Sequence, residues 1–137
     1  MMLSKLKRLN SEERKALLPA LFRLLITRLV LFAGIRNTSR RLGGKLGSGQ
    51  NDFDPALWTA RAKVMQGLAA RLPGMACLTQ SLALRWWMRA HAHDAQMKIG
   101  VCKTAERLES HAWVELDGHS FAEKQVNIAR FQVVESY

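Results

Sequence analysis

Cysteine is scarce in this chain: its 137 residues include only two, and they lie far apart. Two distant cysteines do not provide the disulfide framework of a small secreted domain, so we expect a reduced, cytoplasmic protein. Acidic residues are also few, with 11 Asp and Glu against 21 Lys and Arg. The chain is long enough for one domain with a small core, and its ordinary apolar fraction of 48% excludes general disorder.

The basic excess lies almost entirely in the first third of the chain. Residues 1–50 hold 11 basic and 2 acidic residues, a net charge of +9, whereas residues 51–137 hold 10 and 9, a net of +1. This asymmetry predicts an anionic partner for the N-terminal segment: a membrane surface, nucleic acid or an acidic protein. Nucleic-acid binding calls for basic residues interleaved with exposed aromatic ones, whereas here the basic excess lies on an apolar helix, which argues against it.

That apolar helix is predicted over about residues 12–32, within a mostly apolar stretch, residues 17–35. As a membrane-spanning helix it would carry Arg23 and Arg28 near its middle, each costing about 2.5–3.5 kcal/mol on insertion scales. As a signal peptide it would lack a small-residue cleavage site after the apolar run. We therefore expect a helix that is buried on most of its circumference, with an arginine stripe.

Glycines and basic residues fill residues 37–51, which are predicted to form a flexible linker. The chain would then divide into a basic, apolar helical segment over residues 1–36, this linker, and a core over residues 52–137. The core opens with Asp54 and Pro55, which have the pattern of a helix N-cap and first helical residue.

A second core helix is predicted to begin at Cys77, after Pro73 and Gly74, and to end near His91. Alternating apolar and polar residues then predict strands over residues 96–102, 109–116, 119–125 and 130–134. The Asp-Gly pair between the second and third strands is typical of a hairpin turn. Helices followed by a small antiparallel sheet define an α+β fold.

Cys77 and His111 have the residue types and settings of a cysteine nucleophile site. A helix start and a nearby imidazolium both favour the thiolate, which attacks carbonyl groups, and an imidazole on a strand serves as general base and then acid. Each residue also has a plainer interpretation. Most free cysteines are small core residues, and a histidine on a strand is usually half-buried and satisfied.

A carboxylate that orients the imidazole would complete such a site, and the hairpin register decides which one. Asp117 lies in the turn, about 20 Å along the strand from His111, which is too far for contact. With a three-residue loop ending at Gly118, His111 pairs with Glu123 at about 5 Å between Cβ atoms. With a two-residue loop, Glu123 points to the other face. The sequence leaves both registers open.

Two sequence blocks carry a resemblance to a known family. Cys-Leu-Thr-Gln-Ser-Leu-Ala from Cys77 and His-Ala-Trp-Val-Glu from His111, with Ile-Gly-Val at residues 99–101 between them, resemble the lasso-peptide leader peptidases. These are small transglutaminase-like, papain-related cysteine proteases. The basic, leucine-rich N-terminal helix resembles that of stand-alone members, so the similarity covers nearly the whole chain. It implies a papain/transglutaminase-like core with nucleophile Cys77, base His111 and acid Glu123, where the family has Asp.

The resemblance also implies a reaction, which is removal of the leader from a ribosomally made lasso precursor peptide by acyl transfer from Cys77 to water. It implies no cofactor. A separate lasso cyclase would then close the core peptide, and stand-alone members depend on a small leader-recognition protein. The N-terminal helix is then a docking element for that partner or for the membrane surface. The carboxylate at Glu123 keeps open a non-catalytic scaffold, and His91 and His93 face differently, so no metal site is expected.

Overall fold

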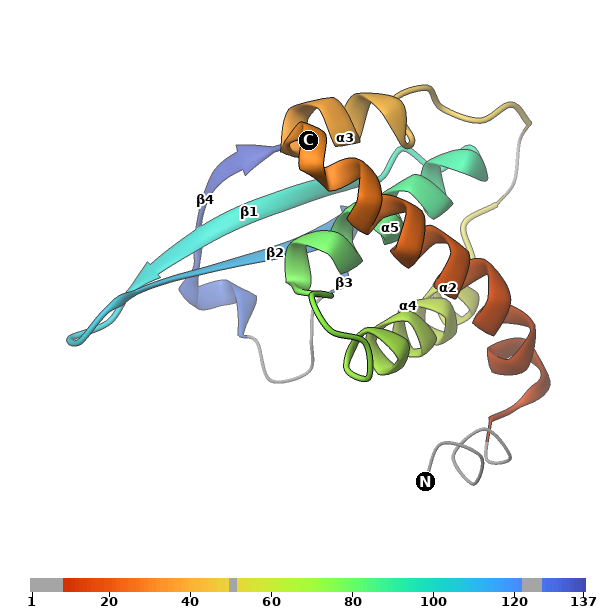
Figure 1. Ribbon diagram of the computed structural model, residues 1–137, viewed down its shortest axis with the longest axis horizontal. Coiled ribbons are helices and arrows are strands. Elements are labelled where there is room, and N and C mark those ends of the chain that lie inside the picture. The colour runs from red at the N-terminus through yellow and green to blue at the C-terminus, as the bar shows by residue number, and fades with distance from the viewer. Residues whose placement is uncertain (1–8, 50–51, 122–126) are drawn as a thin grey trace.

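The computed structural model describes residues 9–49, 52–121 and 127–137 (Figure 1). Its helices are α2 (Ser11–Val30), α3 (Ile35–Arg41), α4 (Pro55–Ala69) and α5 (Cys77–Ala90), with short 3-10 turns η1 (Leu31–Ala33) and η2 (Ile128–Arg130). Its strands are β1 (Gln96–Lys103), β2 (Leu108–Leu116), β3 (His119–Phe121) and β4 (Gln132–Ser136). The predicted α+β fold class is confirmed.

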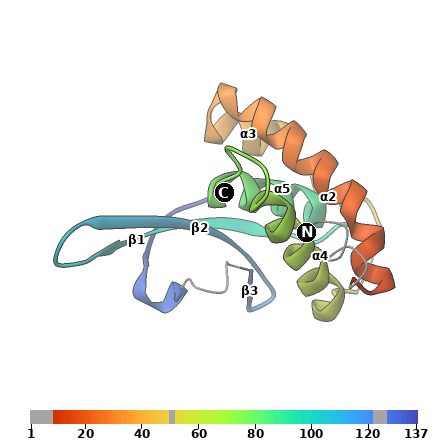
Figure 2. The same cartoon turned by 60° about the horizontal axis from the view of Figure 1, so that its bottom comes forward.

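The strands form one sheet in the order β3-β2-β1-β4, and the pairs β1–β2, β1–β4 and β2–β3 are all antiparallel. Helices α2 to α5 lie on one side of this sheet, while η2 lies on the other (Figure 2). Helix α5 is the central helix of the layer, because it contacts α2, α3, α4, β1 and β2. The main core lies between α2, α4, α5 and the near face of β2, where Val114 and Leu116 are buried.

Helix α2 is capped at its N-terminus by Asn10. The Asn10 side chain accepts a hydrogen bond from the Glu13 main-chain N–H at 2.8 Å and donates one to the Glu13 carboxylate at 3.1 Å. The buried face of the helix is narrow and consists mainly of small residues, with Ala16 and Ala20 packed close to the core. The prediction that α2 is buried on most of its circumference is wrong, because Leu24 is its only buried large apolar residue and several others are exposed.

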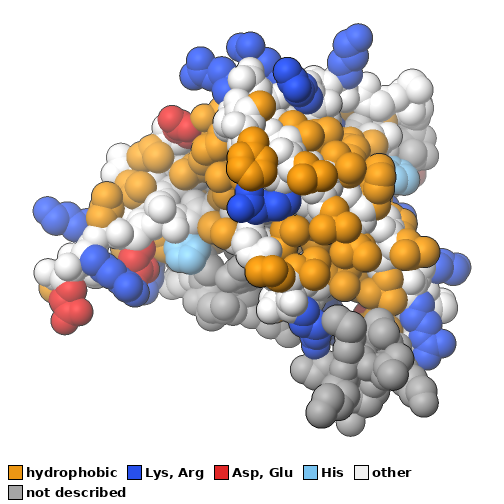
Figure 3. Space-filling model, viewed as in Figure 1, with side chains coloured by type: hydrophobic (Ala, Val, Ile, Leu, Met, Phe, Trp, Pro, Cys, Tyr) orange, Lys and Arg blue, Asp and Glu red, His pale blue; other side chains and the backbone are white. Residues whose placement is uncertain are grey.

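The outward face of α2 and η1 carries five large, exposed apolar side chains: Leu18, Phe22, Leu25, Leu29 and Phe32. Figure 3 shows the resulting apolar surface over α2, with Lys and Arg side chains within and around it. By length and composition, Ser11–Ala33 is long and apolar enough to cross a membrane, a test that some core helices and signal sequences also pass. We call these five side chains the α2 apolar face.

Much of the segment that was expected to be a flexible linker is folded against α5. Residues up to Arg41 belong to α3, and carbonyl groups at the end of α3 and just after it are bound by two arginines one turn apart on α5. The guanidinium of Arg85 donates to the carbonyl oxygens of Ser39 and Leu42 at 3.1 and 3.3 Å, and Arg89 donates to the carbonyl oxygen of Gly43. The N-terminal helix is therefore part of the same packed unit as the sheet.

Candidate active site

Cys77 is the first residue of α5, as predicted from the sequence. Ala76 is its N-cap in an extended conformation, and the preceding turn contains Gly74 with a φ of +76°. Because the first N–H groups of a helix have no partner within the helix, the Cys77 thiol lies beside free amide donors and the positive end of the helix dipole. This position supplies a main-chain donor for a developing oxyanion.

The Cys77 side chain is half-buried in a narrow cleft between α4, α5 and the β2–β3 hairpin. The cleft is also lined by Ala62, Met65, Gln66, Gln80, Ser81, Leu84, Ala112 and Phe121. Its volume is about 20 Å³, which is roughly the space that one water molecule needs. A peptide would therefore have to lie across the opening of this cleft rather than inside it.

The sequence analysis did not identify two glutamines in this lining, although the spacing of one of them, Gln80, gave a signal. Gln80 follows Cys77 by three residues and therefore lies one helical turn away on the same side of α5. Its side-chain amide donates to the carbonyl oxygen of Met75 at 3.1 Å, which ties the turn before the helix to its first turn. Gln66 enters the cleft from α4, and its arrival there depends on tertiary packing that no local pattern reveals.

His111 lies on β2 directly before Ala112, the strand residue that lines the Cys77 cleft. Alternation along a strand sends neighbouring side chains to opposite faces, so His111 leaves the sheet on the side away from Ala112. There its ring contacts Phe131 edge to face, with ring centroids 5.1 Å apart, and Trp113 contacts the same phenylalanine at 6.3 Å. The structure thus brings Cys77 beside the strand position next to His111, and it leaves the two side chains on different sides of β2.

The Nδ1 atom of His111 is buried and has no hydrogen-bond partner within the described residues. A buried ring nitrogen without a partner is costly and uncommon in folded proteins. In a cysteine nucleophile site one ring nitrogen faces the sulfur and the other donates a hydrogen bond to an orienting group, so a ring nitrogen without a partner is a candidate for either contact. The Nδ1 atom of His111 therefore needs a hydrogen-bond partner that the described residues do not supply.

The described part of the hairpin decides between the two registers that the sequence left open. Leu116 pairs with His119, so the loop has two residues, and Asp117 and Gly118 have φ angles of +49° and +79°, as in a type I′ turn. The three-residue alternative, which would have placed Glu123 opposite His111, is wrong for this hairpin. Glu123 itself lies outside the described residues, and its role as the acid stays a prediction.

The other chemically notable side chains lie elsewhere. Cys102 is half-buried on β1, with its sulfur 3.9 Å from a guanidinium nitrogen of Arg130. His91 and His93 both pack edge to face on Trp58. No group of three His, Cys, Asp or Glu side chains that could hold a metal ion exists in the part of the chain that the structure describes.

Comparison with known protein families agrees with this architecture. Residues 20–136 match the profile of the transglutaminase-like superfamily, which includes cysteine peptidases. No curated protein and no solved structure matches the chain. The matched region includes the second half of α2, the whole of α3, α4 and α5, and all four strands. Because it extends over far more than half of the sequence, the chain belongs to the transglutaminase-like superfamily.

Proposed function

We propose that this protein is a cysteine peptidase that removes the leader from a ribosomally synthesised lasso precursor peptide, with Cys77 as nucleophile, His111 as base and acid, and Glu123 as the group that orients His111. The observation that carries the proposal is the position of Cys77. It begins the central helix of a transglutaminase-like fold and shares a cleft with the residue that follows His111. The sequence blocks around both residues add the resemblance to leader peptidases.

The proposed chemistry proceeds in two transfers. In the first, the imidazole takes the thiol proton, the sulfur of Cys77 attacks the carbonyl carbon of the scissile bond, and the amine leaves with the proton that His111 returns to it. The main-chain N–H of Cys77 faces the oxyanion that forms. In the second, His111 takes a proton from water, the hydroxide attacks the thioester, and the leader leaves as a carboxylic acid while the thiol is restored.

This chemistry requires the His111 ring within hydrogen-bond reach of the Cys77 sulfur when substrate is bound. Catalytic hydrogen bonds are often long in a free enzyme and tighten in the substrate complex. In the two-residue register, a strand continued past Phe121 would direct Glu123 to the face opposite His111. The proposal therefore requires the chain to depart from that pairing, so that the Glu123 carboxylate accepts a hydrogen bond from Nδ1, the buried atom that has no partner among the described residues. A longer Glu side chain in place of Asp still spans such a contact.

The α2 apolar face supports a docking role for the N-terminal helix. Monomeric proteins rarely expose a contiguous stripe of large apolar side chains, and such stripes mark interaction sites. We assign this face to a small leader-recognition protein that presents the precursor to the peptidase and hands the product to a lasso cyclase. Exposed basic residues next to it, such as Arg14 and Lys15, favour a partner with acidic residues around its apolar contact surface.

Mass spectrometry of the precursor, incubated with this protein and the leader-recognition protein, tests the proposal. We expect one cleavage at the end of the leader, abolished by Cys77→Ala. The matched control is Cys102→Ala, which removes the other half-buried thiol and should leave cleavage unchanged. Cleavage that survives Cys77→Ala would overturn the assignment of the nucleophile, and loss in both variants would point to damage of the fold.

One observation favours a second candidate, a non-catalytic scaffold that keeps the peptidase fold. The side chains of Cys77 and His111 lie on different sides of β2. A glutamate at residue 123 where the family has Asp points the same way. The same assay separates the two candidates, because a scaffold gives no cleavage with any partner. A scaffold would still bind the leader-recognition protein through the α2 apolar face.

A further inference from the structure

A cavity of about 280 Å³ lies between α2, α4 and α5, at the end of α5 opposite Cys77. It is lined by Arg23 from α2, Arg61 from α4, and Trp87 and His91 from α5, with Glu12 and Lys15 at one side. Helix α5 has 14 residues, so its two ends are about 20 Å apart. The cavity is therefore separate from the Cys77 cleft, and nothing in the proposed peptidase chemistry uses it.

Stacking on tryptophan rings holds the two guanidinium groups in place. The Arg23 guanidinium carbon lies 5.2 Å from the Trp87 ring centre, and that of Arg61 lies 4.9 Å from the same ring. Arg23 also stacks on Trp86 at 5.1 Å, and Arg61 on Trp58 at 4.5 Å. Such contacts leave the edges of a guanidinium, which carry its N–H donors, free to bind an anion.

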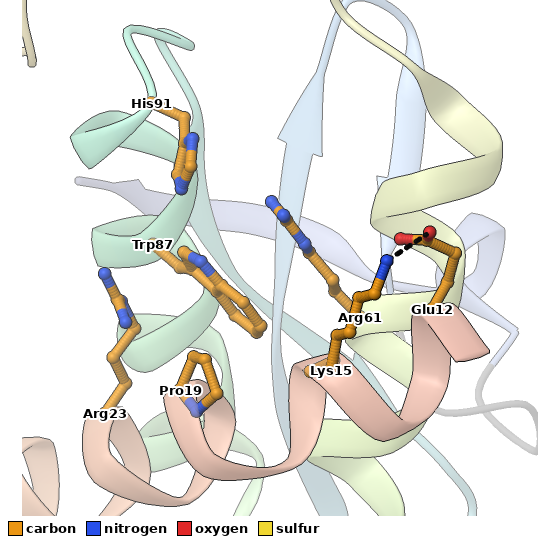
Figure 4. A pocket seen from close by; sticks show the side chains of 8 residues that line it. Glu12, Lys15, Pro19, Arg23, Arg61, Trp87 and His91 are labelled. Carbon is orange, nitrogen blue, oxygen red and sulfur yellow. Dashed lines mark ion pairs between the residues drawn. The ribbon is translucent and has the colours of Figure 1, made fainter. Parts of the chain in front are cut away.

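Figure 4 shows how these groups converge. Arg23 and Arg61 approach Trp87 from different helices, and the His91 ring points toward the same space, while Lys15 is turned to Glu12. The Lys15 ammonium and Glu12 carboxylate form an exposed ion pair at 3.6 Å, so the only carboxylate among the lining residues is shared with a third cation. Arg23, Arg61 and His91 thus meet with little negative charge to balance them.

The electrostatic environment of Arg23, Arg61 and His91 favours a bound anion. The Nε atom of Arg23 is buried and has no hydrogen-bond partner within the described residues. Burial, and then repulsion from Arg61, lowers the pKa of Arg23 from its ordinary value. Burial, followed by repulsion from Arg61, Arg23 and His93, likewise lowers the pKa of His91. An anion placed among these groups would relieve all of these repulsions at once.

We propose that this cavity is a binding site for a phosphate group, carried either by a small phosphate ester or by a lipid headgroup. Planar guanidinium groups bind phosphate through two parallel hydrogen bonds, and a phosphate has enough oxygens to engage Arg23, Arg61 and His91 together. The group is a phosphate monoester, because a carboxylate or a phosphodiester offers only two free oxygens and about half the charge. The cavity is larger than a phosphate ion, so it leaves room for the ester substituent.

Isothermal titration of inorganic phosphate into the full chain, at constant ionic strength set with chloride, tests the site. We expect saturable binding at one site, weakened at least about tenfold by Arg61→Gln or His91→Gln, since each removes a charge-assisted hydrogen bond. The matched control is Arg71→Gln, which removes the same charge from an exposed residue near the end of α4 outside this cavity and should leave binding unchanged. Far-UV circular dichroism checks that every variant is folded.

Two results would overturn the proposal: no saturable phosphate binding by the folded wild-type chain, or equal weakening by Arg61→Gln and Arg71→Gln. A vesicle arm then separates the two sources of the phosphate group. If vesicles of phosphatidic acid, whose headgroup is a phosphate monoester, bind the chain, and both free phosphate and Arg61→Gln reduce that binding, the natural ligand is a lipid headgroup. If vesicle binding is insensitive to Arg61→Gln while phosphate binding is lost, the ligand is a soluble phosphate ester.

Discussion

Gly100 is the residue of β1 that pairs with His111, and a methyl group added there has no room. A Cβ atom at this position would lie 2.6 Å and 2.9 Å from two carbons of the Trp113 ring and 2.9 Å from the Cβ of Phe131. Trp113 is almost fully buried, and Phe131 is the ring that packs on His111. The substitution Gly100→Ala must therefore displace the aromatic side chains that hold the imidazole.

Overpacking of this kind costs about 1–3 kcal/mol of unfolding free energy. At about 2.1 cal/mol/K of unfolding entropy per residue, the chain of 137 residues loses roughly 3.5 °C in Tm for each kcal/mol, so we expect a fall of about 3–10 °C. Because His111 loses its packing, cleavage of the precursor should fall more than the remaining folded fraction explains. Differential scanning calorimetry and the mass-spectrometric assay measure the two effects.

Gly67→Ala is the matched control for this prediction. Gly67 lies inside α4 with helical backbone, and an added Cβ would meet only the Arg71 guanidinium at an ordinary 3.6 Å. Replacing a helix-interior glycine by alanine stabilises by about 0.5–1 kcal/mol, so Tm should rise slightly and cleavage should stay unchanged. If Gly100→Ala leaves both Tm and cleavage at wild-type values, the described packing around His111 is wrong.

Three further predictions follow from other parts of the structure. Arg85→Met removes a buried guanidinium that donates to the carbonyl oxygens of Ser39, Leu42 and Tyr137. Urea unfolding should show that the free energy of unfolding falls by about 2–4 kcal/mol, against less than about 0.5 kcal/mol for the exposed Arg71→Met. Equal losses would contradict the role of these three hydrogen bonds. Glu123→Gln should slow leader removal at least about tenfold by removing the charge behind the imidazole, while Asp117→Asn in the exposed turn should not. Equal or reversed effects would contradict the assignment of Glu123 as the acid. The pKa of His91 is lowered in the folded protein, so the unfolded chain takes up a proton more readily, and Tm should fall as pH drops below the ordinary His pKa of 6.5. His91→Gln should flatten that fall in thermal melts from pH 8 to pH 5. An unchanged pH profile would contradict the lowered pKa of His91.

The elements with strong local signals were predicted well from the sequence. Asp54 caps α4 by accepting hydrogen bonds from the main-chain N–H groups of Ala56 and Leu57, as its position before Pro55 indicated. Helix α5 begins at Cys77, because the Pro-Gly turn before it ends the preceding helix. The central strands were also predicted within one residue of their bounds, since their alternation is regular.

The features that depend on distant contacts could not be predicted in this way. An apolar stretch does not tell which side of a helix is covered, and only the packed structure shows that the small residues of α2 face inward. The glycine-rich segment is held by Arg85 and Arg89, which lie more than forty residues further along the chain. The hairpin register depends on whether Asp117 accepts a left-handed conformation, which the Asp-Gly pair permits without requiring.

The cationic cavity shows the same limit. Arg23 appeared in the sequence only as one member of an arginine stripe, and Arg61 gave no signal at all. Their meeting on Trp87 requires three helices to pack in one particular arrangement.

The alkylation rate of Cys77 by iodoacetamide, followed by peptide mass spectrometry between pH 5 and pH 9, tests the central claim most directly. Cys102 in the same molecule serves as the internal reference, because it is also half-buried but does not begin a helix. If Cys77 and His111 act together, Cys77 should react much faster than Cys102 near pH 6, and His111→Gln should abolish that advantage. Equal rates for the two thiols, or an advantage that His111→Gln leaves intact, would contradict the account.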